Sequence, residues 1–300
     1  MNLNKDALTA LIRQTSTIPP LDLSTKTLLD LLQQPDLYPE QVFNTVNTDP
    51  VLASKLLQVA NSAAYRRQNP VESLKAAITL LGVDLSMSIA FSCALQSACV
   101  RKSASGFNQL RFWRKGVIAA WLALNMKQAT TKVRPEQLYL ACLLQDIGIY
   151  VFSHVLGDKY NQLYSAAKCH RDLISLEQRS IGCDHATAGA ILLAQWGIPN
   201  TLVDAVANSH HLILSKPVEP LSPSYWVALI GMEADFWLMD IDNAQIQQLE
   251  QSLHAHEALQ ADCDRALASI STAGLLFNMT LLESTRVMEL QAYKKASRSE

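Results

Sequence analysis

The sequence predicts an all-α protein. Apolar residues recur at helical spacing over most of the 300 residues, and the polar-apolar alternation of strands is hard to find. The composition fits a globular chain with a sizeable core, since 49% of the residues are hydrophobic and 17% are charged.

The first clear helix begins at Asp49-Pro50, where a carboxylate caps the helix and proline suits its first position. Asn61-Ser62 marks its expected end, with Asn61 either left-handed or bonded to neighbouring backbone groups. A second helix is expected from Val71 to Leu81, with Gly82 as its stop. The next helix, from Leu85, is nearly all apolar and small, which predicts a central position.

A polar loop at residues 101–106 marks a boundary, and a second helical lobe is expected from about Leu110. An aromatic stripe predicts a helix over 112–121, and proline or a carboxylate cap predicts helices from Pro135 to near Gly148, after Asp184 and after Pro199. The helix after Pro199 should direct His210 inward. A further apolar helix is expected over 226–237. Residues 216–224 contain three prolines and should form an irregular loop. The stretch after Asn243 is typical of a closing helical hairpin.

The charge and the cysteines limit the partners and the compartment. A net charge of -2 and a pI near 6.4 argue against nucleic acid or an anionic membrane as partner. Six scattered cysteines without a Cys-x-x-Cys pair indicate reduced thiols and a cytoplasmic location. The N-terminus lacks signal-peptide features, and Leu85 to Val100 falls short of the ~20 apolar residues that span a bilayer.

Three stretches and the residues that follow them occur in an order that indicates a family. They are Asp49-Pro50-Val51-Leu52 leading to Asn61-Ser62-Ala63-Ala64-Tyr65, then Ala77-Ile78-Thr79-Leu80-Leu81-Gly82, then Leu143-Leu144-Gln145-Asp146-Ile147-Gly148 with His185, Gly189, Trp196 to Pro199 and His210-His211. Together they resemble the HDOD family, the HD-related output domains of bacterial signalling proteins, over about Thr17 to His211.

The resemblance implies an all-helical fold in which an N-terminal helical lobe accompanies a lobe related to HD phosphohydrolases. It also implies a role in signal output or protein contact, generally without hydrolase activity. We expect the first lobe at residues 1–105, the HD-like lobe at 106–240 and a C-terminal helical extension at 241–300.

Departures from the HD pattern bear on catalysis. The resemblance implies a metal held by an early histidine, an adjacent His-Asp pair and a later aspartate, but here Gln145 precedes Asp146 and Lys115 falls at the early position. An amide is a poor ligand for a transition metal, and a protonated lysine repels one. The later aspartate is open between Glu233 and Asp235. We therefore expect no catalytic residue, no metal and no cofactor.

The candidates for ligand binding or interaction are Asn61, Lys115, Gln145, Asp146, His185, His210 and His211. Asp146 is expected to accept backbone hydrogen bonds or to pair with Lys115. His185 either lies exposed in the first turn of a helix capped by Asp184 or approaches the old metal cleft. His210 and His211 are expected at a helix end, where the dipole favours a protonated imidazole.

The leading hypothesis is a non-catalytic signal-transduction module that binds a signalling protein partner, with a ligand pocket at the degenerate cleft. One alternative is a metal-dependent phosphohydrolase that uses Asp146, His185, His210 and His211 in a rearranged site. Another is a sensor that binds a nucleotide such as cyclic di-GMP without hydrolysing it.

Overall fold

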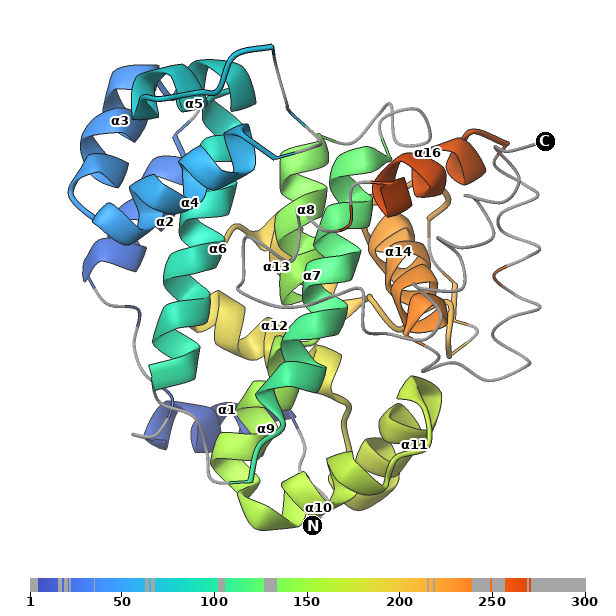
Figure 1. Cartoon of the computed structure of the whole chain (residues 1–300). Helices are drawn as coiled ribbons and strands as arrows, with labels where there is room; N and C mark the ends of the chain where they lie inside the picture. The colour runs from blue at the N-terminus through green and yellow to red at the C-terminus, as the bar shows by residue number, and fades with distance from the viewer. Residues whose placement is uncertain are drawn as a thin grey trace. The chain divides into compact units, whose positions relative to one another are not determined.

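The computed structural model describes residues 5–15, 18, 21, 23–34, 36–62, 65, 68–101, 106–126, 134–214, 216–217, 219–238, 249, 257–268 and 270. Over these residues the protein is built from helices and contains no strand, which confirms the predicted all-α class (Figure 1). The chain divides into two compact units, a smaller one of residues 19–101 and 269–281 and a larger one of residues 1–18, 102–268 and 282–300.

The smaller unit is organised around α6 (Val83–Arg101), which packs against the four helices before it (Figure 1). These are α2 (Leu23–Leu32), α3 (Pro39–Asn47), α4 (Pro50–Ala60) and α5 (Leu74–Leu81). As the uncharged sequence from Leu85 to Val100 predicts, α6 is a core helix, and Ala90 and Phe91 in its middle are buried. Packing of its neighbours on several sides accounts for its lack of a polar face.

The capping residues decide where two of these helices begin. The Asp49 carboxylate accepts hydrogen bonds from the backbone N–H groups of the first turn of α4, as predicted. The start predicted for α5 at Val71 is wrong, because the Ser73 hydroxyl accepts from the Ala76 N–H and caps the helix there. The predicted stop at Gly82 is confirmed, with φ of 84°.

The larger unit is organised around α7 (Gln109–Asn125), which is buried from Phe112 to Leu124 with the exception of Arg114. It packs against α8 (Pro135–Leu144), α14 (Pro223–Trp237) and α16 (Glu257–Ala268). The remaining helices of this unit are α1 (Lys5–Gln14), α9 (Ile147–Leu156), α10 (Asp158–Ala166), α11 (His170–Ser180), α12 (His185–Gln195) and α13 (Asn200–Ala207). Apart from α16, the predicted closing hairpin lies largely outside the described residues.

The helix predicted from Pro135 to near Gly148 is two helices. It begins at Pro135 as expected, but α8 ends at Leu144 and α9 starts at Ile147, so Gly148 lies inside a helix. Gln145 and Asp146 form the turn between them. This turn carries the degenerate dipeptide into the interior, where Gln145 is 2% and Asp146 4% exposed.

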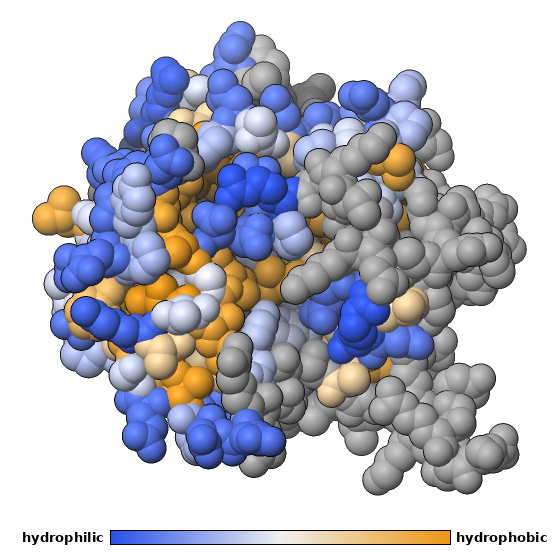
Figure 2. Space-filling model, turned by 90° about the horizontal axis from the view of Figure 1, so that it is seen from above, coloured by the Kyte–Doolittle hydropathy of each residue, from blue (hydrophilic) through white to orange (hydrophobic). Residues whose placement is uncertain are grey.

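Two stretches, 83–100 and 135–156, are long and apolar enough to cross a membrane, but 67% and 89% of them are buried inside the protein. Their apolar character is accounted for by the two cores they occupy. On the face drawn in Figure 2, hydrophilic residues cover much of the described surface and apolar residues show between them.

Candidate functional site

The site lies in the larger unit, where two glycines allow α9 and α12 to cross closely. A Cβ added at Gly148 would overlap the carbonyl oxygen of His185, and one added at Gly189 would lie 3.0 Å from Ile147 Cγ2. The crossing therefore requires a residue without a side chain at Gly148. It brings Asp146, just before α9, to the start of α12, so that Asp146 Oδ1 lies 3.5 Å from His185 Nε2.

Lys115 reaches the site from α7, which approaches α8 closely at Gly116. Its ammonium is buried and lies 3.1 Å from Asp146 Oδ2 and 3.1 Å from Asp235 Oδ1. It also lies 2.6 Å from His170 Nδ1. The expected pairing of Lys115 with Asp146 is present, and α14 supplies a second carboxylate to the same cation.

The electrostatics of this cluster keep Lys115 and Asp146 charged. Burial opposes the ammonium, but the carboxylates of Asp146 and Asp235 outweigh it and raise the pKa of Lys115 above its usual value. Burial likewise opposes the Asp146 carboxylate, but Lys115 and His170 hold its pKa well below its usual range. For Asp235 burial prevails, and its pKa is raised to about 7.

Gln145 and the later acidic residue complete the comparison with the HD pattern. The Gln145 side chain lies against Gly231 on α14, one helical turn before Asp235. Glu233 accepts a hydrogen bond from Trp237 Nε1 at 2.6 Å, so Asp235 is the acidic residue at the Lys115 ammonium. A metal between Asp146 and Asp235 does not fit these residues, because a buried ammonium already lies between them.

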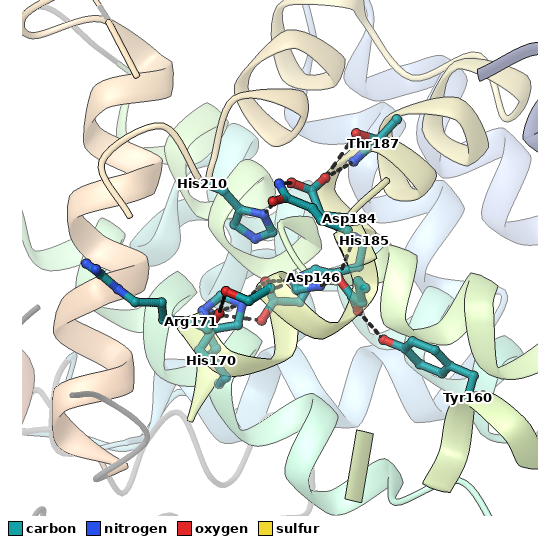
Figure 3. A network of polar contacts seen from close by, with 12 residues as sticks. Asp146, Tyr160, His170, Arg171, Asp184, His185, Thr187 and His210 are labelled. Carbon is teal, nitrogen blue, oxygen red and sulfur yellow. Dashed lines mark hydrogen bonds and ion pairs between the residues drawn. The ribbon is translucent and has the colours of Figure 1, made fainter. Parts of the chain in front are cut away.

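Three histidines surround the other side of Asp146 (Figure 3). His170 begins α11, His185 begins α12, and His210 lies in the turns that follow α13. One ligand atom from each, together with a carboxylate oxygen of Asp146, lies within 4.8 Å of the others. All four residues are buried, and in Figure 3 the neighbouring Arg171 points away from them.

Each histidine has a carboxylate at its Nδ1. His170 Nδ1 lies 2.8 Å from Asp235 Oδ2, and His185 Nδ1 lies 2.7 Å from Glu177 Oε2. His210 Nδ1 lies 3.3 Å from Asp184 Oδ2. The Glu177 carboxylate is fixed further by the Tyr160 hydroxyl, which donates to its Oε1 at 2.5 Å, and by the backbone N–H of His185 at 2.9 Å. These contacts fix the ring orientations of His170 and His185.

The surroundings separate the protonation of two histidines. Burial opposes a charged His185, but the carboxylates of Glu177 and Asp146 outweigh it and raise its pKa to about 10. Burial and the charge of His185 instead lower the pKa of His210 to about 4, against the pull of Asp184. The predicted protonated imidazole at a helix end is therefore wrong for His210, which is buried and neutral at pH 7.

The other sequence candidates take different places. Asp184 caps α12 as expected, but His185 beside it is fully buried, because Glu177 holds both its backbone and its ring. His211 lies beside His210 and is partly exposed, outside the four-ligand cluster. Asn61 belongs to the smaller unit.

The Asn61 side chain joins the end of α4 to the segment before α5. Its Nδ2 donates to the carbonyls of Leu57 and Val71, at 3.0 and 2.8 Å, and its Oδ1 accepts from the Val71 N–H at 2.7 Å. The predicted bonding to backbone groups is confirmed. The left-handed alternative is wrong, since φ is -95°.

Sequence reasoning missed His170 and Glu177. Neither belongs to a short motif, and His170 stands at the start of a polar helix without the apolar pattern that would mark it as buried. Glu177 lies on α11 and His185 begins the next helix, α12, so their contact depends on how the chain turns between these two helices. The only sequence signal for them is that they are a histidine and an acidic residue within the HD-like region.

A cavity of about 390 Å³ borders this cluster. Lys115, Asp146 and His170 reach it from the cluster, and its other polar residues include Arg111, Arg114 and Lys168. Arg111 is fixed over the Tyr164 ring, 4.6 Å from its centroid, and donates to the Tyr164 carbonyl at 2.9 Å. The lining is therefore rich in cations, and it lies wholly within the larger unit.

Comparison with solved structures places the fold among known ones. An HDOD domain protein of unknown function from Geobacter sulfurreducens is 19% identical with a TM-score of 0.73, covering 91% of this chain and 99% of that protein. A candidate signal transduction protein from Marinobacter aquaeolei VT8 is 19% identical with a TM-score of 0.65, covering 91% and 65%. A candidate metal-dependent phosphohydrolase from Shewanella amazonensis SB2B is 19% identical with a TM-score of 0.63, covering 91% and 98%. At these identities the likeness concerns the fold.

An uncharacterized protein of Treponema pallidum (strain Nichols) is 20% identical over 225 residues, which cover 72% of this chain. The chain spans only 41% of the length of that relative. The sequence also matches the HDOD domain over residues 18–212, about the range that the motifs indicated. The chain therefore belongs to the HDOD family.

Proposed function

We propose that the protein is a non-catalytic signal-transduction module of the bacterial cytoplasm that acts through protein binding. The observation that carries the proposal is the position of Lys115, whose ammonium bonds Asp146 and Asp235. These are the carboxylates that the HD phosphohydrolase pattern assigns to a metal. A lysine ammonium satisfies their charge but offers no coordination position for water or a phosphoryl oxygen, which a hydrolytic metal supplies.

Turnover of a phosphodiester such as bis(4-nitrophenyl) phosphate, with Mg²⁺, Mn²⁺ or Fe²⁺ added, tests the absence of catalysis. We expect no rate above the buffer blank. The Lys115→His, Gln145→His double variant returns both missing histidines and is the matched comparison for metal-dependent turnover. Metal-dependent hydrolysis by the unaltered protein, lost in Asp146→Ala, would contradict the proposal.

The proposed output is contact with a signalling protein. Membership of a family of output domains and the net charge of -2 support a protein rather than a nucleic acid as partner. All six cysteines are free thiols, which supports a reducing compartment. Affinity capture from the source bacterium, followed by reconstitution with the purified partner, is the test. Failure to reconstitute any captured protein as a complex would count against this output.

A second function is favoured by the cation-rich cavity beside Lys115, which suits an anionic small molecule such as a phosphorylated metabolite or a nucleotide. Its volume of about 390 Å³ is within the usual range of ligand pockets. Calorimetric titration with ATP, pyrophosphate and cyclic di-GMP is the test. We expect Lys168→Ala, in the cavity lining, to lower the affinity, whereas Lys216→Ala, outside the lining, should not. No heat of binding with any of the three removes the sensor function.

A further inference from the structure

Asp146 contributes its two oxygens to different neighbours. Its Oδ2 bonds Lys115, whereas Oδ1 has no hydrogen-bond partner among the described residues and faces His185 Nε2 at 3.5 Å and His170 Nε2 at 3.8 Å. We propose that Asp146, His170, His185 and His210 bind one divalent transition metal ion, for which Zn²⁺ is the best match to three imidazoles and a carboxylate.

The histidines are oriented as metal ligands are. In protein metal sites a ligating histidine donates its second ring N–H to a carboxylate or a carbonyl, which fixes the ring. Here His170 and His185 have such carboxylates in Asp235 and Glu177, and Asp184 Oδ2 lies 3.3 Å from His210 Nδ1. Three buried rings that each have a carboxylate at Nδ1 and converge on one aspartate are not explained by packing.

The contact between His170 and His185 needs a shared proton or a metal ion. Their Nε2 atoms lie 3.1 Å apart. The Nδ1 proton of His185 is assigned to Glu177 at 2.7 Å, while His170 Nδ1 lies 2.6 Å from the Lys115 ammonium and 2.8 Å from Asp235 Oδ2. The two Nε2 atoms therefore face one another across a proton in the metal-free protein, and a metal ion bound there would take the place of that proton.

His210 provides an independent observation. It is 3% exposed, and neither of its ring nitrogens has a hydrogen-bond partner among the described residues, although Asp184 lies 3.3 Å from Nδ1. Its ring is 4.4 Å from that of His185 and 5.2 Å from that of His170, measured between centroids. A polar ring buried without a hydrogen bond is costly, and coordination through Nε2 would satisfy it.

The charges around the cluster favour a cation. Asp146, Glu177, Asp184 and Asp235 are four buried or nearly buried carboxylates, and in the described part of the chain they are balanced by Lys115 and, in the metal-free protein, by a protonated His185. A divalent ion would bring the local charge closer to neutrality. This site is separate from the Lys115 position, although both share Asp146 through different oxygens.

Metal analysis of protein purified without a polyhistidine tag or a metal column tests the proposal. After equilibration with Zn²⁺ and dialysis we expect about one ion per chain, and Co²⁺ should give the visible absorption of a nitrogen- and oxygen-coordinated ion. His170→Gln and His210→Gln should each lower Zn²⁺ affinity by at least a hundredfold. Glu177→Gln, behind His185, should lower it about 10- to 100-fold.

His211→Gln is the matched control, because His211 adjoins His210 in sequence but lies outside the cluster. It should bind as the unaltered protein does. Circular dichroism of each variant verifies folding, and the melting temperature of the unaltered protein should rise on addition of Zn²⁺. Substoichiometric binding of both ions, or an equal loss in His211→Gln and His210→Gln, would overturn the proposal and leave a proton-bridged histidine cluster.

The metal proposal and the proposed function fail separately. Bound metal without turnover agrees with both, and metal-dependent turnover that needs Asp146 overturns only the proposed function. Absence of both metal and turnover overturns only the metal site.

Discussion

Lys115 Nζ lies 3.1 Å from Asp235 Oδ1, so a lysine of α7 and an aspartate of α14 form a buried ion pair in the interior of the larger unit. Asp146 accepts from the same ammonium at 3.1 Å. Taking three charged groups out of water is costly, and their mutual attraction offsets that cost only while all three are present. Loss of any one of the three should therefore destabilise the folded protein.

Replacement of the lysine should be strongly destabilising. In Lys115→Met two buried carboxylates lose their cation, and removal of one partner from a buried pair costs about 3–5 kcal/mol. Urea unfolding at neutral pH measures the change in unfolding free energy. Lys75→Met is the control, because the Lys75 and Glu40 side chains are 66% and 75% exposed at 4.0 Å, and such pairs contribute about 0–1 kcal/mol. Equal losses in the two variants would be inconsistent with a buried ion pair at Lys115.

The features that the sequence predicts well are those with local causes. Asp49, Gly82 and Asp184 act as predicted because a cap or a stop needs only the adjacent turn of helix. The exposed alternative for His185 was wrong because a distant group decides its position, since Glu177 holds the His185 ring. The start of α5 was wrong because Ser73 caps that helix, while the Val71 N–H before it donates to Asn61.

The candidate site was only half visible for the same reason. The pairing of Lys115 with Asp146 follows from the family pattern, whereas His170 begins a helix that no sequence motif marks. Its role depends on α11 and α12 converging on Asp146, which precedes α9. Periodicity within one segment carries no information about such a meeting.

The crossing of α9 and α12 gives a second prediction. Gly148→Ala places a methyl group on the His185 carbonyl, so the helices must separate and the cluster must open. We expect a loss of about 4 kcal/mol or more in unfolding free energy. Gly157→Ala meets no atom within 4 Å, and its cost comes from the backbone alone, whose φ of 58° and ψ of -137° suit glycine; we expect about 1–3 kcal/mol. Denaturant titration of both variants gives the order, and a smaller loss at Gly148 would contradict the close crossing.

The Asn61 contacts give a third prediction, for the smaller unit. Asn61→Ala removes three hydrogen bonds that join the end of α4 to Val71, and because the site is exposed we expect about 1–2 kcal/mol. Asn208→Ala removes one bond, from Nδ2 to the Asp204 carbonyl at 2.8 Å, and should cost less. Thermal and urea unfolding measure both. The idea fails if Asn61→Ala is no more damaging than Asn208→Ala.

The last prediction concerns the pH dependence of the metal-free protein. The folded pKa of His185 is raised to about 10, so its stabilising contribution is complete below its unfolded pKa of 6.5 and is lost as pH rises from there toward the folded value. The groups that face it are Glu177 and His170 from α11, Asp146 from the turn before α9, and His210.

Between pH ~7 and ~8.5 this loss should amount to about 2 kcal/mol, since each unit of pH contributes about 1.4 kcal/mol for one proton. The upper bound keeps the unfolded cysteines mostly protonated. His185→Gln, measured by urea unfolding with a chelator present, should remove this slope while His211→Gln retains it. A slope unchanged in His185→Gln would mean that the folded protein does not hold the extra proton at His185.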